Sequence, residues 1–295
     1  MGLVTSPLRY PGGKSKAVNF LKNFFPVDFK ELREPMCGGA SITLYWAQVK
    51  PFVKYIIGDK NFDLYCFWKE LKERPEKLIK EILSLWQSYK DGRKLYEEIL
   101  QRRPYLSNDT LQRAVDFFVL NRITFSGTTD SGGYSEEAFR KRFTSKSIEK
   151  LYSVSKILQR IEVYHGDYSQ LLREEGENVV IFLDPPYYSS RGSKLYGNKG
   201  TLHTEFDHYR LKEEVLKCKH KILITYDNSK EIKELYIDFY IVGWKLKYGM
   251  ANYGKNYLRE GDELLIANYP LESYLENLQK QPSMFQKVVI YTSWA

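Results

Sequence analysis

The sequence predicts an α/β fold built on a mostly parallel sheet. Short apolar segments rich in β-branched residues recur along the chain, and helical patterns separate several of them, which is typical of parallel strands joined by helices. The expected parallel strands are residues 31–36, 53–59, 162–167, 179–184 and 221–227, and four of these five end in aspartate. Because ligands of open α/β sheets bind at the carboxyl ends of the strands, we expect the functional site at this edge.

Two further segments, 240–247 and 263–269, are expected to complete the sheet. No helix-length segment separates them, so they are expected to pair in antiparallel fashion. The end of the chain predicts a short helix at 272–279 and a strand at 288–291, to which the sequence assigns no role.

Between the second and third expected strands, residues 62–160 lack clear strands and carry helical patterns. We therefore interpret this segment as an inserted helical domain within a sheet domain formed by residues 1–61 and 161–295. Its centre, 124–134, is rich in Gly, Ser and Thr and is expected to form a turn or hairpin tip.

The composition is that of a globular protein, with 295 residues of which 43% are hydrophobic and 28% charged. No apolar run approaches the roughly 18 residues that cross a bilayer, and the first residues lack the pattern of a secretion signal. We therefore expect a cytoplasmic protein with no membrane partner. Three cysteines without a Cys-x-x-Cys pair argue against a disulfide framework, and four histidines show no ligand spacing with cysteine, so no metal site is expected.

Positive charge favours a polyanionic partner. The formal net charge is +8 and the sequence pI is near 9.0. Residues 62–160 alone contain 19 basic and 14 acidic side chains. Within them Arg140, Lys141 and Arg142, followed by Lys146, are suited to contact phosphates, although such clusters are also common on solvated helix faces.

The most informative motif is Asp184-Pro185-Pro186-Tyr187, which follows the apolar segment 179–183. Two consecutive prolines cannot donate sheet hydrogen bonds, so they end the strand and stiffen the turn. This turn suits the exocyclic amine of a nucleobase, whose lone pair is delocalised into the ring until acceptors pull its N–H bonds out of plane. Asp184 and the Pro185 carbonyl are the expected acceptors, and Tyr187 is expected to stack on the base.

Two glycine-containing segments predict a site for a small ligand. The segment 10–14 is not a phosphate loop, because Leu8 stands where that motif requires glycine. It retains an aromatic residue and a lysine that can cover a ligand and pair with a carboxylate. Gly38 and Gly39 follow the first strand, and Asp59 ends the second strand twenty residues later. At this spacing an acidic side chain meets ribose hydroxyls, so the pattern favours an adenosine-containing cofactor.

The order of these motifs resembles the DNA adenine methylase family of DNA N6-adenine methyltransferases. The resemblance rests on Tyr-Pro-Gly-Gly-Lys, Glu-Pro-x-x-Gly-Gly-Ala-Ser, Gly-Asp-x-Asn, Leu-Asn-Arg, Gly-Asp-Tyr and Asp-Pro-Pro-Tyr at residues 10–14, 34–41, 58–61, 120–122, 166–168 and 184–187. It implies a seven-stranded Rossmann-like methyltransferase sheet, S-adenosylmethionine as the cofactor, and a target-recognition role for the inserted domain. The implied reaction is methylation of a flipped-out adenine in double-stranded DNA. The sequence does not specify the oligomeric state, for which we expect a monomer, and it does not show whether the protein has a cognate restriction endonuclease as a partner.

The resemblance also implies roles for individual residues. Those implied in catalysis are Asp184, Pro185, Pro186 and Tyr187. Those implied in cofactor binding are Tyr10, Lys14, Pro35, Gly38, Gly39, Ser41, Asp59, Asn61, Asp167, Tyr168 and Asp184. Lys14 is expected near the carboxylate of the cofactor, and Asp167 with Tyr168 near its adenine. Those expected to contact DNA are Arg122, Arg140, Lys141, Arg142 and Lys146.

Two alternatives stay open. The same fold could act on an RNA adenine, a cytosine N4 amine or a protein glutamine amide, although the aspartate at position 184 favours adenine over the last two. The protein could also be a catalytically idle DNA-binding subunit, which the retained Lys14, Asp59 and Asp184 argue against. The sequence does not specify the DNA site that is recognised.

Overall fold

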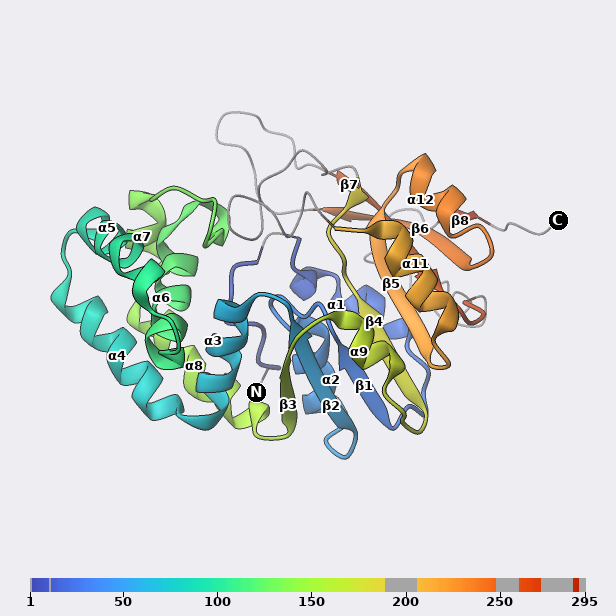
Figure 1. Ribbon diagram of the computed structural model, residues 1–295, viewed down its shortest axis with the longest axis horizontal. Coiled ribbons are helices and arrows are strands. Elements are labelled where there is room, and N and C mark those ends of the chain that lie inside the picture. The colour runs from blue at the N-terminus through green and yellow to red at the C-terminus, as the bar shows by residue number, and fades with distance from the viewer. Residues whose placement is uncertain (1, 11, 189–205, 248–259, 272–288, 292–295) are drawn as a thin grey trace.

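Eight strands form one mixed sheet, flanked by helices (Figure 1). The computed structural model describes residues 2–10, 12–188, 206–247, 260–271 and 289–291. The strands are β1 (Glu31–Glu34), β2 (Lys54–Asp59), β3 (Ile161–His165), β4 (Val179–Leu183), β5 (Lys221–Asp227), β6 (Tyr240–Lys247), β7 (Glu260–Ala267) and β8 (Val289–Tyr291). Their order across the sheet is β3-β2-β1-β4-β5-β7-β6-β8. Strands β1 to β5 run parallel, β7 is antiparallel to β5 and β6, and β8 is antiparallel to β6.

The predicted fold class is confirmed. All seven expected strands lie in the sheet, and the last two form the expected antiparallel pair. The segment expected as a strand at 288–291 supplies β8, which extends the seven-stranded sheet at its β6 edge. The helix expected at 272–279 lies outside the described residues. None of the helices that the structure describes is long and apolar enough to cross a membrane.

Helices cover both faces of the sheet because its central strands are apolar on both sides. Along β4, Val180 and Phe182 belong to one hydrophobic cluster, while Val179, Ile181 and Leu183 belong to another. The helices that contribute to the first cluster beside the sheet are α1 (Val18–Leu21) and α2 (Ser41–Val49). The helices of the second cluster are α9 (Tyr168–Arg173), α11 (His208–Lys217) and α12 (Lys230–Leu235).

The segment between β2 and β3 is helical, as expected. Its helices are α3 (Phe62–Glu73), α4 (Pro75–Ser88), α5 (Gly92–Arg102), α6 (Thr110–Ile123), α7 (Glu136–Arg142) and α8 (Ser145–Leu158). A bridge between Thr124 and Tyr134 closes the expected turn. Helix α6 is the core of the insertion, since every side chain from 114 to 123 is buried. One hydrophobic cluster continues from the sheet into these helices, so the division of the chain into two domains stays a prediction.

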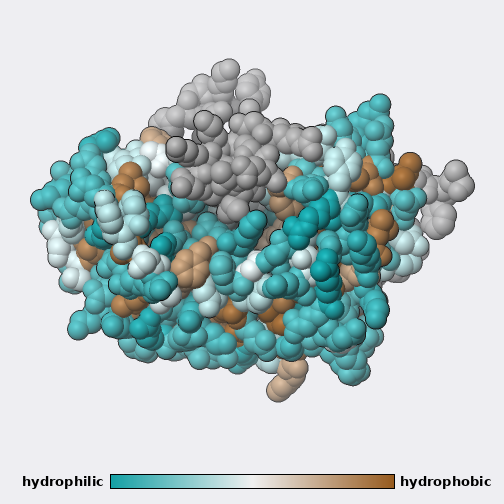
Figure 2. Space-filling model, in the orientation of Figure 1, coloured by the Kyte–Doolittle hydropathy of each residue, from teal (hydrophilic) through white to brown (hydrophobic). Residues whose placement is uncertain are grey.

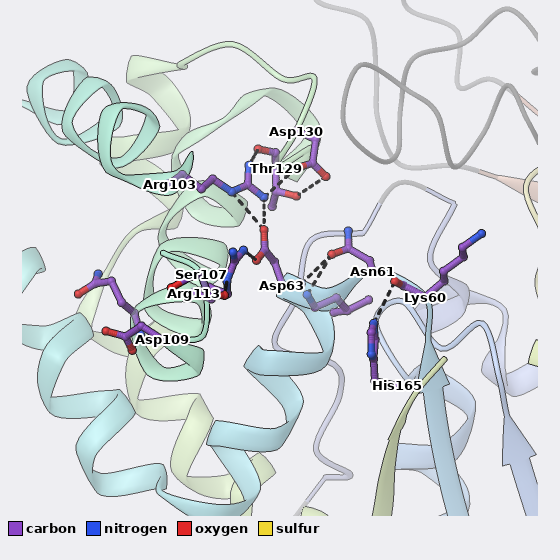
Figure 3. Close-up of polar contacts among 12 residues, drawn as sticks. Lys60, Asn61, Asp63, Arg103, Ser107, Asp109, Arg113, Thr129, Asp130 and His165 are labelled. Carbon is purple, nitrogen blue, oxygen red and sulfur yellow. Dashed lines mark hydrogen bonds and ion pairs between the residues drawn. The ribbon is translucent and has the colours of Figure 1, made fainter. Parts of the chain in front are cut away.

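A network of ion pairs lies where the insertion begins (Figure 3). Asp63, in the first turn of α3, pairs with Arg103 at 2.6 Å and with Arg113 at 2.7 Å. Arg103 also pairs with Asp130 at 2.7 Å. The Asn61 side chain caps the N-terminus of α3 by accepting backbone N–H groups. These contacts tie three segments of the insertion to the helix that starts directly after β2.

Candidate active site

The carboxyl ends of four parallel strands meet at one edge of the sheet. Strand β1 lies between β2 and β4, and β5 follows β4. These strands end at Glu34, Asp59, Leu183 and Asp227, so the predicted glycine segment and the Asp-Pro-Pro-Tyr turn leave the sheet at the same edge. The sheet topology therefore gathers residues that are far apart in the sequence.

Asp184 is held by two side chains at the end of β4. Lys14 Nζ donates to both of its carboxylate oxygens, at 2.7 and 2.8 Å, and the Thr225 hydroxyl donates to Oδ1 at 2.7 Å. The Lys14 side chain is 3% exposed and that of Asp184 is 22% exposed. Burial lowers the pKa of Lys14, but Asp184, Glu263 and Glu34 offset this effect and leave that pKa raised. Lys14 therefore stays charged and keeps the Asp184 carboxylate in a fixed orientation.

Tyr187 lies near the same lysine. The Lys14 ammonium is 5.2 Å from the centre of the Tyr187 ring. Burial raises the pKa of the Tyr187 hydroxyl well above its usual range, and the nearby Glu263 and Asp184 raise it further. The two prolines of the turn are buried at Pro185 and half-buried at Pro186. Structure and sequence thus agree that this turn presents a carboxylate and an aromatic ring together.

The glycine segment after β1 packs against the predicted aromatic residue of the N-terminal loop. Gly38 has a φ of +44°, a conformation that favours glycine. A Cβ atom at Gly38 would lie only 2.8 Å from Cε1 of Tyr10, so a side chain there would displace the tyrosine ring. Gly39 lies against Ser6 and Tyr10, where an added Cβ would be 3.0 Å from the Ser6 hydroxyl oxygen. The segment therefore requires a bare backbone facing Tyr10.

Asp59 connects this glycine segment to β2. Its Oδ2 accepts the Gly38 N–H at 3.2 Å and its Oδ1 accepts the Asn61 N–H at 2.9 Å. Burial raises the pKa of Asp59 to about 6, even though these backbone donors lower it. Each carboxylate oxygen can accept a second hydrogen bond, so Asp59 retains acceptor capacity for a diol.

The other predicted cofactor residues near this segment make structural contacts. Pro35 lies beside Gly58 of β2, because a Cβ atom added at Gly58 would be 3.6 Å from the Cα atom of Pro35. Ser41 begins α2, and its hydroxyl is 2.8 Å from that of Ser15. Asn61 caps α3. All three stand at the carboxyl edge, as expected.

Asp167 and Tyr168 lie beside Arg210 of α11, which the sequence reasoning did not identify. Asp167 caps α9 and pairs with Arg210 at 2.8 Å. Burial alone would raise the pKa of Asp167, but hydrogen bonds from Arg210 and Ser169 lower it to about 2. The guanidinium group of Arg210 also lies 5.3 Å from the centre of the Tyr168 ring. Asp167 and Tyr168 are thus held by the charge of Arg210, which lies on α11, 43 positions after Asp167 in the sequence.

Thr225, Glu263 and Glu34 also belong to the site although the sequence reasoning missed them. Thr225 holds Asp184, and Glu263 on β7 is 1% exposed next to Lys14. Burial raises the pKa of Glu34 to about 7, and its carboxylate accepts the Thr43 N–H at 2.9 Å. A usable signal was present for Glu263, because an acidic residue opens the otherwise apolar run 263–267.

The residues expected to contact DNA divide into two groups. Arg122 is 7% exposed, and its guanidinium group donates to the Pro7 carbonyl oxygen inside the protein. Burial, with Arg9 and Arg142 nearby, lowers the pKa of Arg122 to about 9. This placement does not bring Arg122 to the surface, so a phosphate contact by it stays a prediction that the structure does not favour.

The remaining basic residues are exposed on α7 and α8. Arg140 pairs with Glu136 at 2.5 Å and Lys141 pairs with Glu137 at 2.9 Å, each across one helical turn. Exposed pairs of this kind are worth only about 0.2 to 1 kcal/mol, so they do not prevent a lysine or arginine from binding a phosphate. Arg142 and Lys146 are exposed as well.

Figure 2 shows a mostly hydrophilic face, on which hydrophobic residues form small separate groups. Within the described parts of the chain, no group of three or more His, Cys, Asp or Glu residues is placed to hold a metal ion.

The sheet has the order, the glycine segment after β1, the acidic residue at the end of β2 and the polar turn after β4 that are expected of a Rossmann-like methyltransferase. The model of one family, the D12 class N6 adenine-specific DNA methyltransferases, matches residues 10–250. The chain belongs to this family.

Several curated proteins are similar to the chain. It is 26% identical to the DNA N-6-adenine-methyltransferase of Escherichia phage P1 over 79% of this chain and 31% of that protein. It is 25% identical to the type II methyltransferase M.MjaIII of Methanocaldococcus jannaschii over 61% of this chain and 68% of that protein. It is 23% identical to the type II methyltransferase M1.LlaDCHI of Lactococcus lactis subsp. cremoris over 88% of this chain and 94% of that protein. The chain thus spans about a third of the phage relative and about two thirds of the archaeal one.

Proposed function

We propose that the protein transfers a methyl group from S-adenosylmethionine to the N6 amine of a flipped-out adenine in double-stranded DNA. The observation that carries this proposal is the Asp184 carboxylate, which Lys14 and Thr225 hold in place beside the Tyr187 ring. Membership of the adenine-specific family supports the choice of adenine.

The described residues fit S-adenosylmethionine. The Tyr10 ring lies where a Cβ at Gly38 would be, so Tyr10 and the glycine segment form one wall of the site, and Asp59 beside them keeps acceptor capacity for the two ribose hydroxyls. Tyr10 lies over this segment, and Asp167 with Tyr168 lies at the same edge next to Arg210. When bound, the cofactor supplies a methyl group on a positively charged sulfur.

The part of the site around Asp184 would act on the amine. Asp184 and the Pro185 carbonyl accept the two N–H bonds of the amine, which turns its lone pair out of conjugation with the ring. From the described residues, Asp184 Oδ1 accepts two hydrogen bonds and Oδ2 accepts one, which leaves one acceptor position of Oδ2 for the amine. Because Lys14 and Thr225 fix the carboxylate beforehand, little reorganisation is needed at the moment of reaction.

Two energies determine whether the base leaves the duplex. Extruding a base costs on the order of a few kcal/mol. Stacking on an aromatic side chain such as Tyr187 returns roughly 1 to 3 kcal/mol per base. The exposed basic residues of α7 and α8 would hold the DNA backbone during this step, with the inserted helices as the target-recognition domain.

The proposal also covers the oligomeric state, the location and the protein partner of the enzyme. We propose a monomer in the cytoplasm that modifies a specific DNA site, with a cognate restriction endonuclease as its partner. Two relatives are named type II methyltransferases, which supports the restriction partner in this proposal.

One experiment tests the proposed function. The purified protein is incubated with methyl-labelled S-adenosylmethionine and with duplex DNA, single-stranded DNA or RNA, and the product is digested and identified by mass spectrometry. We expect N6-methyladenine in duplex DNA, and loss of at least about 100-fold in rate for Asp184→Ala, the effect of removing one preorganised polar contact. Label in RNA alone, or an Asp184→Ala rate within threefold of the parent, would contradict the proposal.

A further inference from the structure

Glu263 is a buried carboxyl group whose position the proposed reaction leaves unexplained. It lies on β7, opposite Asp227 of β5 and Trp244 of β6. The residue is 1% exposed, and neither of its carboxyl oxygens has a hydrogen-bond partner of standard geometry among the described residues. A buried carboxyl group without a partner is destabilising, so a native protein that keeps one has a reason to do so.

The groups that face Glu263 come from three elements of the active site. Lys14 faces it from the N-terminal loop, Asp184 and Tyr187 face it from the turn after β4, and Asp227 faces it from the end of β5. The Tyr187 hydroxyl is buried and also lacks a partner of standard geometry among the described residues. The two unsatisfied groups lie close enough to each other for the hydroxyl to influence the carboxyl group. The hydroxyl lowers the pKa of Glu263 and the carboxyl group raises that of Tyr187, so each group acts on the other.

We propose that Glu263 is a positioning residue for methyl transfer, which acts through Tyr187 and Lys14 and does not touch the base. This inference rests on the proposed function. In its ionised form Glu263 accepts the Tyr187 hydroxyl and so fixes the ring on which the base stacks. It also places a negative charge beside Lys14 and Asp184, near the amine, where positive charge develops as the N–C bond forms and the C–S bond breaks with its electron pair passing to sulfur. The methylated amine then releases one N–H proton to water, which leaves a neutral product. The protonated form supplies no such charge.

The direction of a pH effect follows from the surroundings of Glu263. Burial raises its pKa to about 7, with Asp184 and Asp227 acting in the same direction and Lys14 and Tyr187 acting against it. The group is therefore protonated below about pH 7 and ionised above it. If the ionised form is the active one, the rate of transfer rises with pH through this value and then levels off.

The test is the pH profile of single-turnover methyl transfer, measured at saturating S-adenosylmethionine and duplex DNA from pH 5.5 to 9. The parent is expected to show a rise near pH 7. Glu263→Gln keeps the shape of the side chain but cannot ionise, so its rate at pH 8.5 is expected to be lower by about tenfold, less than for a direct polar contact. Its profile is expected to have no rise near pH 7.

Two further variants make the test specific. Glu34→Gln removes the other buried carboxyl group whose pKa lies near 7, and its profile is expected to retain the rise. Tyr187→Phe removes the hydroxyl that lowers the pKa of Glu263, so the rise is expected to move to higher pH. A Glu263→Gln profile that keeps the rise, or loss of the rise in Glu34→Gln, would overturn the proposal.

A measurement without turnover separates this inference from the proposed function. The carboxyl ¹³C signal of Glu263 in glutamate-labelled protein, assigned by its absence from Glu263→Gln, reports the pKa directly. A value raised well above the usual 4.3 or so, and raised further in Tyr187→Phe, supports the inference. A pKa at its ordinary value overturns the inference even if the enzyme is active, whereas a parent that transfers no methyl group to any substrate contradicts the proposed function alone.

Discussion

Replacing Lys14 by glutamine is expected to destabilise the protein and to slow methyl transfer. Lys14 Nζ lies 2.7 and 2.8 Å from the two oxygens of Asp184, and its side chain is 3% exposed. Removing one partner of a buried ion pair costs about 3 to 5 kcal/mol, because the remaining charge is left uncompensated. Asp184 is 22% exposed and keeps its bond from Thr225, so we expect a smaller loss, about 2 to 3 kcal/mol. Transfer is expected to fall about 100-fold, as for loss of one preorganised polar contact.

The loss is measured by urea unfolding of the full chain, with Lys16→Gln as the matched control. Lys16 is exposed and stands two residues away, so its replacement is expected to change the free energy of unfolding by less than about 0.5 kcal/mol. For the double variant Lys14→Gln with Asp184→Asn, the loss in free energy of unfolding is expected to be smaller than the sum of the two single losses by about 1 to 3 kcal/mol. Additive effects of the two substitutions would refute the ion pair as the reason for the loss.

Three further outcomes are expected at other parts of the site. Asp59→Asn is expected to weaken S-adenosylmethionine binding, as measured by calorimetry. Because the pKa of Asp59 is about 6, the affinity of the parent is expected to fall as the pH drops through this value. An affinity that does not depend on pH would contradict the ribose contact. Replacement of Arg140, Lys141 and Arg142 by alanine is expected to flatten the dependence of log K for DNA on log salt by roughly 0.9 per lost phosphate contact, without changing cofactor affinity. Tyr187→Ala is expected to lose roughly 1 to 3 kcal/mol of stacking, seen as brighter emission from a fluorescent adenine analogue at the target position, and equal emission in variant and parent would place the base elsewhere.

The sequence predicts the sheet and the edge that carries the site because both depend on local patterns. Strand periodicity and the residues that end each strand are local, and parallel strands bring their carboxyl ends together. The partners of the site residues are not local. Lys14 and Asp184 are separated by 170 positions, and no pattern in either segment indicates that they pair. The pairing of Asp167 with Arg210 likewise depends on how α11 packs beside α9.

Arg122 lies deeper in the protein than its residue type suggests. A basic residue next to a predicted DNA-binding segment is expected at the surface. Helix α6 is buried on all sides from residue 114 to residue 123, which is typical of a helix in the centre of a domain. Arg122 therefore points into the protein, where the Pro7 carbonyl oxygen accepts from its guanidinium group. Its role in the described structure is to connect the insertion to the N-terminal loop.

The four strand-end aspartates illustrate how one local pattern can serve different purposes. Asp59 accepts backbone N–H groups from the glycine segment, and Asp167 is neutralised by an arginine. Asp227 accepts the Tyr188 N–H at 2.7 Å and so holds the end of the Asp-Pro-Pro-Tyr turn. Of the four, only Asp184 is fixed by a lysine and a threonine side chain beside an aromatic ring, with an acceptor position on Oδ2 that none of the described residues fills. The chemistry of this edge therefore depends on the partners that the tertiary fold brings to each aspartate, and the aspartates alone do not determine it.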